Sequence, residues 1–265
     1  MVFSDSKLDA ISQVSIVGPG FENIRVSNSS VIVEAVDSRY DRQVSIFGEE
    51  GQGMIQHMTI SIVGVGGTGS SVAVQLARIG VGKLILVDKD SMDKTNLTRV
   101  YGSTFGDVGL PKVDVVRKHI KSFSKKTKVE VLQRDVSKDD VIPKLIESDI
   151  VFGCTDNLSS RAVLNDISIQ YFIPLIDVGC RIHKHPDGSI NQILAKIHLV
   201  TPDTACLWCT HTLDGVAIMQ ESLLENEKEK LAQEGYIEST DKQPSIISLT
   251  SMAASLGVNK LLQLV

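Results

Sequence analysis

A glycine-rich turn between two short apolar runs restricts the fold of this chain more than any other feature. The β-branched run Thr59–Val63 is followed at once by Gly64–Gly69 (GVGGTG), and a largely apolar stretch continues over 70–79. A second apolar run, Lys83–Val87, then ends at Asp88. The order of strand, glycine turn, helix, strand and carboxylate predicts a βαβ unit, in which a helix joins two parallel strands.

The same alternation continues along the chain. Helices are expected at 112–123, 139–147, 159–171, 223–234 and 248–264, and strands at 129–132, 149–152, 173–177 and 190–199. Helical pieces broken by Gly48, Gly51 and Gly53 are expected over 39–58. Alternating strands and helices are typical of a parallel sheet covered on both faces. We therefore expect an α/β fold: a Rossmann-like, doubly wound, mostly parallel sheet with an added antiparallel portion.

The first 38 residues differ from this pattern. Short strands are expected at 13–17 and 30–34, and turn-forming residues lie between and around them. A single β-hairpin is only marginally stable by itself. We therefore expect 1–38 to form a small N-terminal β-hairpin, an appendage or linker that docks on one large domain over 39–265 or on a neighbouring molecule.

Composition and charge argue against several broad classes of protein. The formal net charge is −5 at pH 7, so the fold as a whole is not expected to bind nucleic acid or a membrane surface. No apolar run approaches the roughly 18 residues that span a bilayer, and the first residues lack the pattern of a secretory signal. Four cysteines in 265 residues do not make a disulfide scaffold. A soluble, cytoplasmic protein is expected.

The glycine turn fits the fingerprint of a nucleotide-binding loop. Gly64, Gly66 and Gly69 have the Gly-x-Gly-x-x-Gly spacing. In this motif the first glycine makes the tight turn, the second lets the backbone approach a phosphate, and the third lets the helix pack on the strand. Asp88, at the end of the next strand, stands where it can hold ribose hydroxyls. Taken alone, the turn favours NAD.

Charged and polar side chains farther along the chain favour a triphosphate instead. They lie at expected strand ends or in the segments that follow: Asp90, Asn96, Arg99, Lys112 and Asp156. In α/β folds, ligands bind at the carboxyl ends of the strands. A dinucleotide needs no such set of cations. A triphosphate with Mg²⁺ does, because its charge must be neutralised as pyrophosphate leaves.

Seven motifs follow one another in a fixed order along the chain. They are Arg39-Tyr-Asp-Arg-Gln43, the Gly64–Gly69 turn, Asp88-x-Asp90, Asn96-x-x-Arg99, Gly109-x-Pro-Lys112, Cys154-Thr-Asp-Asn157 and Cys206-x-x-Cys209. Together they resemble the ThiF/MoeB/HesA family of ubiquitin-activating-enzyme-like adenylyltransferases over about residues 39–265. Two further segments, 47–52 and 177–182, resemble bacterial members found beside JAB-type isopeptidases.

The resemblance implies an adenylation domain over 39–265 and a specific reaction. A partner's C-terminal carboxylate, usually that of Gly-Gly, attacks the α-phosphate of MgATP, and an acyl-adenylate and pyrophosphate are formed. By the same resemblance the glycine turn, Gly67 included, binds the nucleotide and Asp88 holds its ribose. Asp90 and Asn157 are also expected to border the nucleotide. Arg161 is expected either to join the site or to pair with a carboxylate.

Five residues are expected to act on the reaction itself. The resemblance implies that Lys112 and Asn96 stabilise the α-phosphate while charge moves, and that Arg99 binds the outer phosphates. Asp156 is expected to hold Mg²⁺. Arg42 is expected to reach the γ-phosphate from the other subunit of a homodimer. No general base is needed, because a carboxylate is already ionised at neutral pH.

The cysteines depart from the family pattern. Cys206-x-x-Cys209 has the spacing of half a structural zinc site, but the second cysteine pair that family members carry beyond the final helix does not follow here. Zinc bound with the help of His198 or His211 is one alternative, and two reduced thiols are the other. Residues 210–265 contain no cysteine, which puts a thioester step in doubt.

The resemblance also implies partners. The substrate would be a small ubiquitin-like or sulfur-carrier protein ending in Gly-Gly, and a conjugating enzyme or a JAB isopeptidase would be a further partner. Two other functions stay open: an NAD-dependent oxidoreductase, and a non-catalytic, partner-binding subunit of an activating enzyme. The sequence does not choose between carrier proteins and small peptides as substrates.

Overall fold

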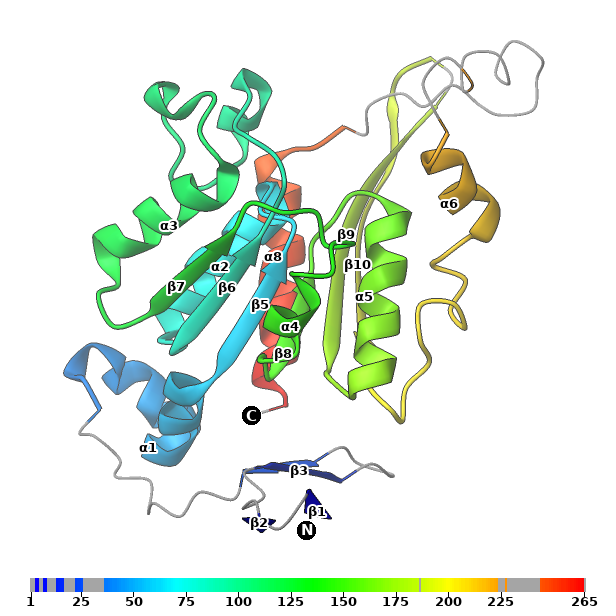
Figure 1. The fold of residues 1–265 in the computed structure, drawn as a ribbon. Helices are drawn as coiled ribbons and strands as arrows, with labels where there is room; N and C mark the ends of the chain where they lie inside the picture. The colour runs from blue at the N-terminus through cyan, green and yellow to red at the C-terminus, as the bar shows by residue number, and fades with distance from the viewer. Residues whose placement is uncertain are drawn as a thin grey trace.

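The computed structural model describes residues 3–4, 7–8, 13–16, 22–25, 36–185, 187–223, 227 and 244–264. Its main body is a six-stranded sheet with the order β10-β9-β8-β5-β6-β7, drawn in Figure 1. The strands are β5 (Thr59–Val63), β6 (Lys83–Val87), β7 (Lys128–Leu132), β8 (Ile150–Gly153), β9 (Leu175–Lys184) and β10 (Ile190–Val200). All neighbours pair in parallel except β9 and β10, which are antiparallel. The predicted α/β class, mostly parallel sheet and antiparallel portion are confirmed.

Helices cover the sheet and short 3-10 helices occur in the loops. The helices are α1 (Asp41–His57), α2 (Gly67–Ile79), α3 (Lys112–Phe123), α4 (Ile142–Leu145), α5 (Leu158–Tyr171), α6 (Gly215–Glu221) and α8 (Ile247–Leu262). The 3-10 helices are η1 (Ser38–Tyr40), η2 (Lys94–Thr98) and η3 (Phe105–Asp107). Near the N-terminus, β1 (Phe3–Ser4) pairs with β2 (Lys7–Leu8), and β3 (Gln13–Ile16) pairs with β4 (Glu22–Arg25).

The strand order creates a topological switch point between β5 and β8. From β5 the chain passes through α2 to β6 and then to β7, whereas β8 and β9 lie on the other side of β5. The first crossover helices after β5 and β8 therefore diverge, and they leave room above the carboxyl ends of these two strands. Ligands of open α/β sheets bind at this place.

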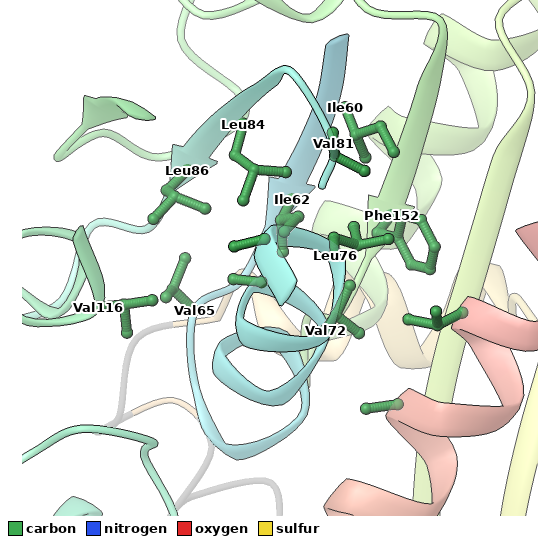
Figure 2. Close-up of a cluster of buried hydrophobic side chains, with 14 of the residues drawn as sticks. Ile60, Ile62, Val65, Val72, Leu76, Val81, Leu84, Leu86, Val116 and Phe152 are labelled. Atoms are coloured by element: carbon green, nitrogen blue, oxygen red, sulfur yellow. The ribbon is translucent and has the colours of Figure 1, made fainter. Parts of the chain in front are cut away.

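Alternation along the strands fills two separate apolar layers. Ile60, Leu84 and Phe152 belong to a cluster formed with α2, α3 and α8, which is shown in Figure 2. Their neighbours along the strands, such as Ile85 and Val151, belong to a second cluster with residues of α4 and α5. Successive strand residues point to opposite faces, so near-continuous apolar runs are what a sheet covered on both faces requires.

Several predicted boundaries needed correction. Helix α2 begins at Gly67, inside the glycine turn. The helix expected at 139–147 shrinks to the four residues of α4, because Pro143 stands at its start and a proline has no N–H to continue a preceding helical turn. Strand β9 runs to Lys184, well beyond the predicted 173–177.

The expected interruptions of the first helix are only partly confirmed. Gly48 breaks α1 with φ 70° and ψ 173°, a conformation that only glycine adopts without strain. Gly51 and Gly53 lie inside the helix. Strand 13–17 is confirmed as β3, but it pairs with 22–25, whereas the expected partner at 30–34 lies outside the described residues. Most of the helix expected at 223–234 lies outside them too.

Among the described residues, no helix is both long enough and apolar enough to cross a membrane.

Candidate nucleotide site

The glycine turn is fixed in shape by contacts that exclude any side chain. Gly64 has φ +86°, and a Cβ there would lie 2.6 Å from the carbonyl oxygen of Cys154 on the neighbouring β8 loop. A Cβ on Gly69 would lie 1.8 Å from the carbonyl oxygen of Gly64. The turn, the start of α2 and the end of β8 are therefore packed backbone against backbone. The two glycines act as the sequence predicts, for the tight turn and for close packing of the helix.

Gly66 differs from these two glycines because it faces open space. A Cβ at Gly66 would meet no atom within 4 Å. Gly66 is also the N-cap of α2, and no side chain of the described residues accepts a hydrogen bond from the first turn of this helix. The N–H groups at the start of a helix attract anions. The residues present thus fit a phosphate group: no side chain among the described residues caps the backbone donors, and the space beside Gly66 is open.

Asp88 links the glycine turn to the loop that follows β6. Its Oδ2 accepts a hydrogen bond from the N–H of Val65 at 2.7 Å, and its Oδ1 accepts one from Asp90 N–H at 2.8 Å. Burial raises the pKa of Asp88 above its ordinary value, against the opposing effects of Lys112 and these two N–H groups. With a raised folded pKa, its contribution to stability is present at low pH and is lost as the pH rises through that value.

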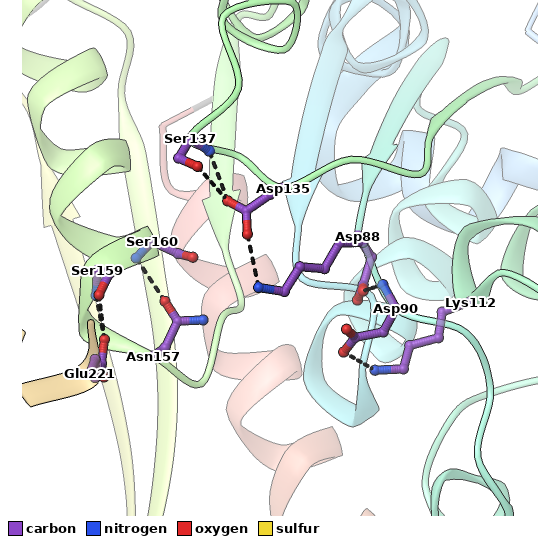
Figure 3. A network of polar contacts seen from close by, with 10 residues as sticks. Asp88, Asp90, Lys112, Asp135, Ser137, Asn157, Ser159, Ser160 and Glu221 are labelled. Carbon is purple, nitrogen blue, oxygen red and sulfur yellow. Dashed lines mark hydrogen bonds and ion pairs between the residues drawn. The ribbon is translucent and has the colours of Figure 1, made fainter. Parts of the chain in front are cut away.

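Lys112 and Asp90 form an ion pair at the same edge of the sheet. The Lys112 Nζ lies 2.8 Å from Asp90 Oδ2, and the lysine side chain is only 12% exposed whereas that of Asp90 is 53% exposed. The backbone also holds them together, because Lys112 N–H donates to the carbonyl oxygen of Asp90. Figure 3 shows both side chains beside Asp88. The structure thus brings a confined cation next to the predicted ribose-binding carboxylate.

The η2 segment presents Asn96 and Arg99 close to the start of α2. Asn96 is buried, and its Oδ1 accepts from Asp93 N–H at 3.0 Å in a capping box that fixes η2. Arg99 donates from Nη1 to the carbonyl oxygen of Thr95 at 2.8 Å. Its Cγ and Cδ atoms would each lie 3.2 Å from a Cβ on Gly67. Arg99 therefore lies against the first residue of α2, at the end of the helix that attracts anions.

The predicted magnesium ligand lies on the loop after β8, across the switch point from the glycine turn. Asp156 is exposed, and within the described residues no hydrogen bond or ion pair engages its carboxylate. Asn157 caps α5, since its Oδ1 accepts from Ser160 N–H at 2.7 Å. Mg²⁺ is commonly bound by one or two carboxylates together with substrate phosphates. An exposed carboxylate on the loop after β8 fits that donor set.

Arg161, on the first turns of α5, pairs with a carboxylate, one of its two expected alternatives. Its Nη1 lies 3.2 Å from Oδ2 of the buried Asp177 on β9. Its Nε and Nη2 donate to the carbonyl oxygen of Thr155 at 3.3 and 3.0 Å. Burial raises the pKa of Asp177, while Arg161 opposes the rise. Arg161 therefore ties the Asp156 loop to its own helix and to the next strand.

Lys89 adds a cation that belongs to none of the predicted site residues. Its Nζ lies 2.8 Å from Oδ2 of Asp135, on the loop after β7. Asp135 also accepts from the N–H and hydroxyl of Ser137 at 3.0 and 2.8 Å, as Figure 3 shows. Asp156 is among the carboxylates that raise the pKa of Lys89. The lysine thus contributes positive charge on the side of the site that holds the predicted magnesium ligand.

Asp135→Asn is expected to show a defined pH dependence. The hydrogen bond from Lys89, helped by Ser137, lowers the pKa of Asp135 from 3.8 to about 2. Ionised Asp135 therefore stabilises the fold above its ordinary pKa, and this contribution is lost as the pH falls through about 2. Because Lys89 is mostly exposed, the substitution should lower the free energy of unfolding by at most about 1 kcal/mol at pH 7.

Urea denaturation at pH 7, 4 and 2 would check this expectation. The difference in unfolding free energy between the wild-type chain and Asp135→Asn should shrink from pH 4 to pH 2. A difference that is the same at pH 7 and pH 2 would show that the charge of Asp135 does not stabilise the fold.

Arg42 is the one predicted catalytic residue that the structure does not bring to this group. It lies exposed on the first turn of α1. Helix α1 leads into the start of β5 and lies below the sheet in Figure 1, away from the loops at the carboxyl ends of the strands. In a single chain Arg42 is therefore separate from Lys112 and Asp156. Its expected action from a second subunit stays a prediction.

The two thiols of the Cys-x-x-Cys motif are close together. The Sγ atoms of Cys206 and Cys209 lie 3.5 Å apart. The intervening Leu207 is anchored by its N–H, which donates to Asn165 on α5. No group of three or more His, Cys, Asp or Glu side chains in the described part of the chain is placed to hold a metal ion. Two thiols make at most half of a structural zinc site, which needs four ligands.

Comparisons with known proteins agree with this geometry. The model of the ThiF family matches residues 40–265. The SAMP-activating enzyme E1 of Haloferax volcanii is 31% identical over 173 residues, which cover 64% of this chain and 60% of that protein. The sulfur carrier protein ThiS adenylyltransferase of Escherichia coli K12 is 30% identical over 140 residues, covering 52% of this chain and 56% of that protein. The chain thus matches less than two thirds of the length of these relatives.

Solved structures with this fold include E. coli MccB. The complex described as MccB with MccA-N7isoASN superposes with a TM-score of 0.68 at 22% identity, covering 86% of this chain and 64% of that chain. MccB with ATP superposes with a TM-score of 0.64, also at 22% identity and with the same two shares covered. At this identity the likeness establishes the fold.

Proposed function

Because the chain belongs to the ThiF family, we propose that it is an adenylyltransferase that activates the C-terminal carboxylate of a small protein or peptide with ATP. The observation that carries the proposal is the arrangement at the switch point. Three features lie in the segments that follow the carboxyl ends of β5, β6 and β8: the uncapped start of α2 at Gly66, the largely buried Lys112 and the exposed carboxylate of Asp156. This donor set suits a triphosphate with a divalent cation. The glycine turn taken alone would also suit NAD, but the cations beside it favour a triphosphate.

The proposed mechanism relies on positioning and electrostatic stabilisation. The glycine turn and the start of α2 bind phosphate through backbone N–H groups, and Asp88 and its neighbours hold the ribose. The partner's carboxylate forms a bond to the α-phosphorus, and the bond to the departing pyrophosphate breaks. Lys112 and Asn96 stabilise the negative charge on the α-phosphate, and Arg99 binds the outer phosphates. Asp156 would hold Mg²⁺, which when bound would supply positive charge to offset that of the departing pyrophosphate.

We also propose the finer assignments that the sequence suggests. The substrate is a ubiquitin-like or sulfur-carrier protein ending in Gly-Gly, and the working unit is a homodimer in which Arg42 acts on the partner's site. Two relatives support the substrate class, since their names refer to SAMP activation and to the sulfur carrier protein ThiS. A JAB isopeptidase or a conjugating enzyme would be a further partner. Zinc would require ligands in addition to Cys206 and Cys209.

Carrier-dependent exchange of labelled pyrophosphate into ATP tests the proposal. Purified protein should incorporate label only when Mg²⁺ and a carrier with an intact C-terminal Gly-Gly are both present. A carrier that lacks its last two residues serves as the matched control. Calorimetry with NAD and MgATP separates the oxidoreductase alternative. Adenylation would be refuted if no small protein or peptide supports exchange and the protein binds NAD more tightly than MgATP.

A further inference from the structure

A carboxylate distant in sequence is bound to the first turn of α5. Glu221, the last residue of α6, accepts hydrogen bonds from Leu158 N–H at 2.8 Å and Ser159 N–H at 2.9 Å. The Ser159 hydroxyl donates a third at 2.5 Å. Ser160 N–H, the next donor of the turn, is already bound by Asn157. Figure 3 shows Glu221 meeting the start of the helix. The start of α5 is therefore capped, in contrast to the start of α2.

Within the part of the chain that the structure describes, helix α6 has little apolar packing against other elements. None of its residues is buried, and Val216 and Met219 are 62% and 60% exposed. Ile218 alone of its apolar side chains is described as packing on the cluster beside α5. Charge-assisted hydrogen bonds are stronger than neutral ones. The Glu221 contact is therefore a principal attachment between α6 and α5.

The first turns of α5 are bonded to the loop that carries Asp156. Asn157 caps the helix with its own side chain, and Arg161 holds the carbonyl oxygen of Thr155 with two N–H groups. Asp156 stands between these fixed points. Whatever restrains the first turn of α5 therefore restrains the carboxylate of Asp156 as well.

We propose that Glu221 is a positioning residue for the divalent cation: by binding Leu158 and Ser159 it holds the Asp156 loop in the orientation that the cation requires. The inference rests on the proposed function, because it uses Asp156 as the cation ligand. Residues that orient a metal ligand through hydrogen bonds commonly affect metal affinity when they are replaced. Glu221 itself would touch neither nucleotide nor cation.

Glu221→Gln is the informative substitution. The amide has one acceptor oxygen, and its NH₂ group would face an N–H donor, so the paired contacts cannot be kept. Isothermal calorimetry of ATP binding at a series of Mg²⁺ concentrations needs no carrier protein. The Mg²⁺ concentration for half-maximal ATP binding should rise about tenfold. Because the contact is exposed, the melting temperature should change by only a few degrees.

Glu147→Gln is the matched control. Glu147 also accepts from two groups, the ammonium groups of Lys83 and Lys144 at 3.2 and 3.0 Å. It precedes β8 and so lies at the opposite end of the sheet from Asp156. This variant should bind ATP with the wild-type dependence on Mg²⁺. Ser159→Ala, which removes one of the three donors, should give a smaller shift than Glu221→Gln.

The possible results separate the two claims. A lower melting temperature of Glu221→Gln with an unchanged Mg²⁺ dependence would make Glu221 merely structural and overturn the inference. The proposed function fails independently if wild-type protein binds MgATP but supports no carrier-dependent exchange. In that case the shift in Mg²⁺ dependence of ATP binding in Glu221→Gln still decides the role of Glu221. Wild-type protein that binds ATP without any dependence on Mg²⁺, or not at all, would overturn the inference directly.

Discussion

Replacing Lys112 with alanine is expected to lower carrier-dependent pyrophosphate exchange by about 10²–10³-fold, the usual effect of removing one donor to a developing negative charge. Lys112 is 12% exposed and is held by Asp90 at 2.8 Å, so its ammonium group is already oriented before any ligand binds. No water molecule could replace that fixed charge. The measurement is the initial rate of exchange at saturating carrier and MgATP.

Stability should change far less than activity in this variant. The ion pair with the half-exposed Asp90 is expected to contribute about 1 kcal/mol or less to the free energy of unfolding. Lys83→Ala removes an equally charged side chain that pairs with Glu130 and Glu147 and should keep wild-type exchange. Equal losses of exchange in both lysine variants, or full exchange in Lys112→Ala, would refute the assignment.

Mixing two inactive variants tests the second subunit. In a homodimer whose sites each need Lys112 from one chain and Arg42 from the other, Lys112→Ala combined with Arg42→Ala produces mixed dimers with one intact site. Exchange should return to about a quarter of the wild-type rate when the subunits redistribute freely. Failure to regain activity while mixed dimers form would place Arg42 outside the partner's site.

Gly69→Ala is expected to cause the largest loss of stability, about 3 kcal/mol or more. The added Cβ would lie 1.8 Å from the carbonyl oxygen of Gly64 and 2.9 Å from its carbonyl carbon. Both atoms belong to backbone, so no flexible side chain can move aside. The turn must shift, and it would separate α2 from β5 and from the end of β8. Chemical denaturation followed by circular dichroism measures the change.

Gly66→Ala provides the contrast within the same turn. Its φ of −77° is negative, so alanine tolerates it, and its Cβ would meet no atom within 4 Å. The free energy of unfolding should therefore change by less than about 1 kcal/mol. The methyl group would occupy the space beside the first N–H groups of α2, so MgATP binding should weaken markedly. Gly69→Ala with unchanged stability would contradict the packing of the turn.

The sequence was sufficient to predict the parts of the fold that depend on local patterns. The runs at 59–63 and 83–87 and the glycine spacing are local signals, so the bounds of β5 and β6 are predicted correctly, whereas α2 begins inside the glycine turn, earlier than predicted. The convergence of Asp88, Lys112 and Asp156 also followed, because carboxyl ends of parallel strands meet at one edge. The helix expected at 139–147 is longer than α4, because the proline at the start of α4 limits the helix.

Contacts between distant segments could not be predicted in this way. Glu221 lies far along the chain from the residues it binds, and it ends a short exposed helix that the sequence pattern did not predict. Lys89 and Asp135 pair across two loops whose paths depend on the whole sheet. The structure was needed to show that Asn157 is engaged in capping α5, although its motif marks it only as a neighbour of the nucleotide.

The division of the sheet into two apolar layers has a consequence for how such chains diversify. The layer behind the glycine turn and the layer beneath α5 share no member, and substitutions that share no contacts tend to act additively. Inherited changes can therefore accumulate beneath α5 and α6 without disturbing the packing behind the phosphate-binding loop. Related chains can in this way keep the same phosphate-binding loop while the surface around α5 and α6 changes.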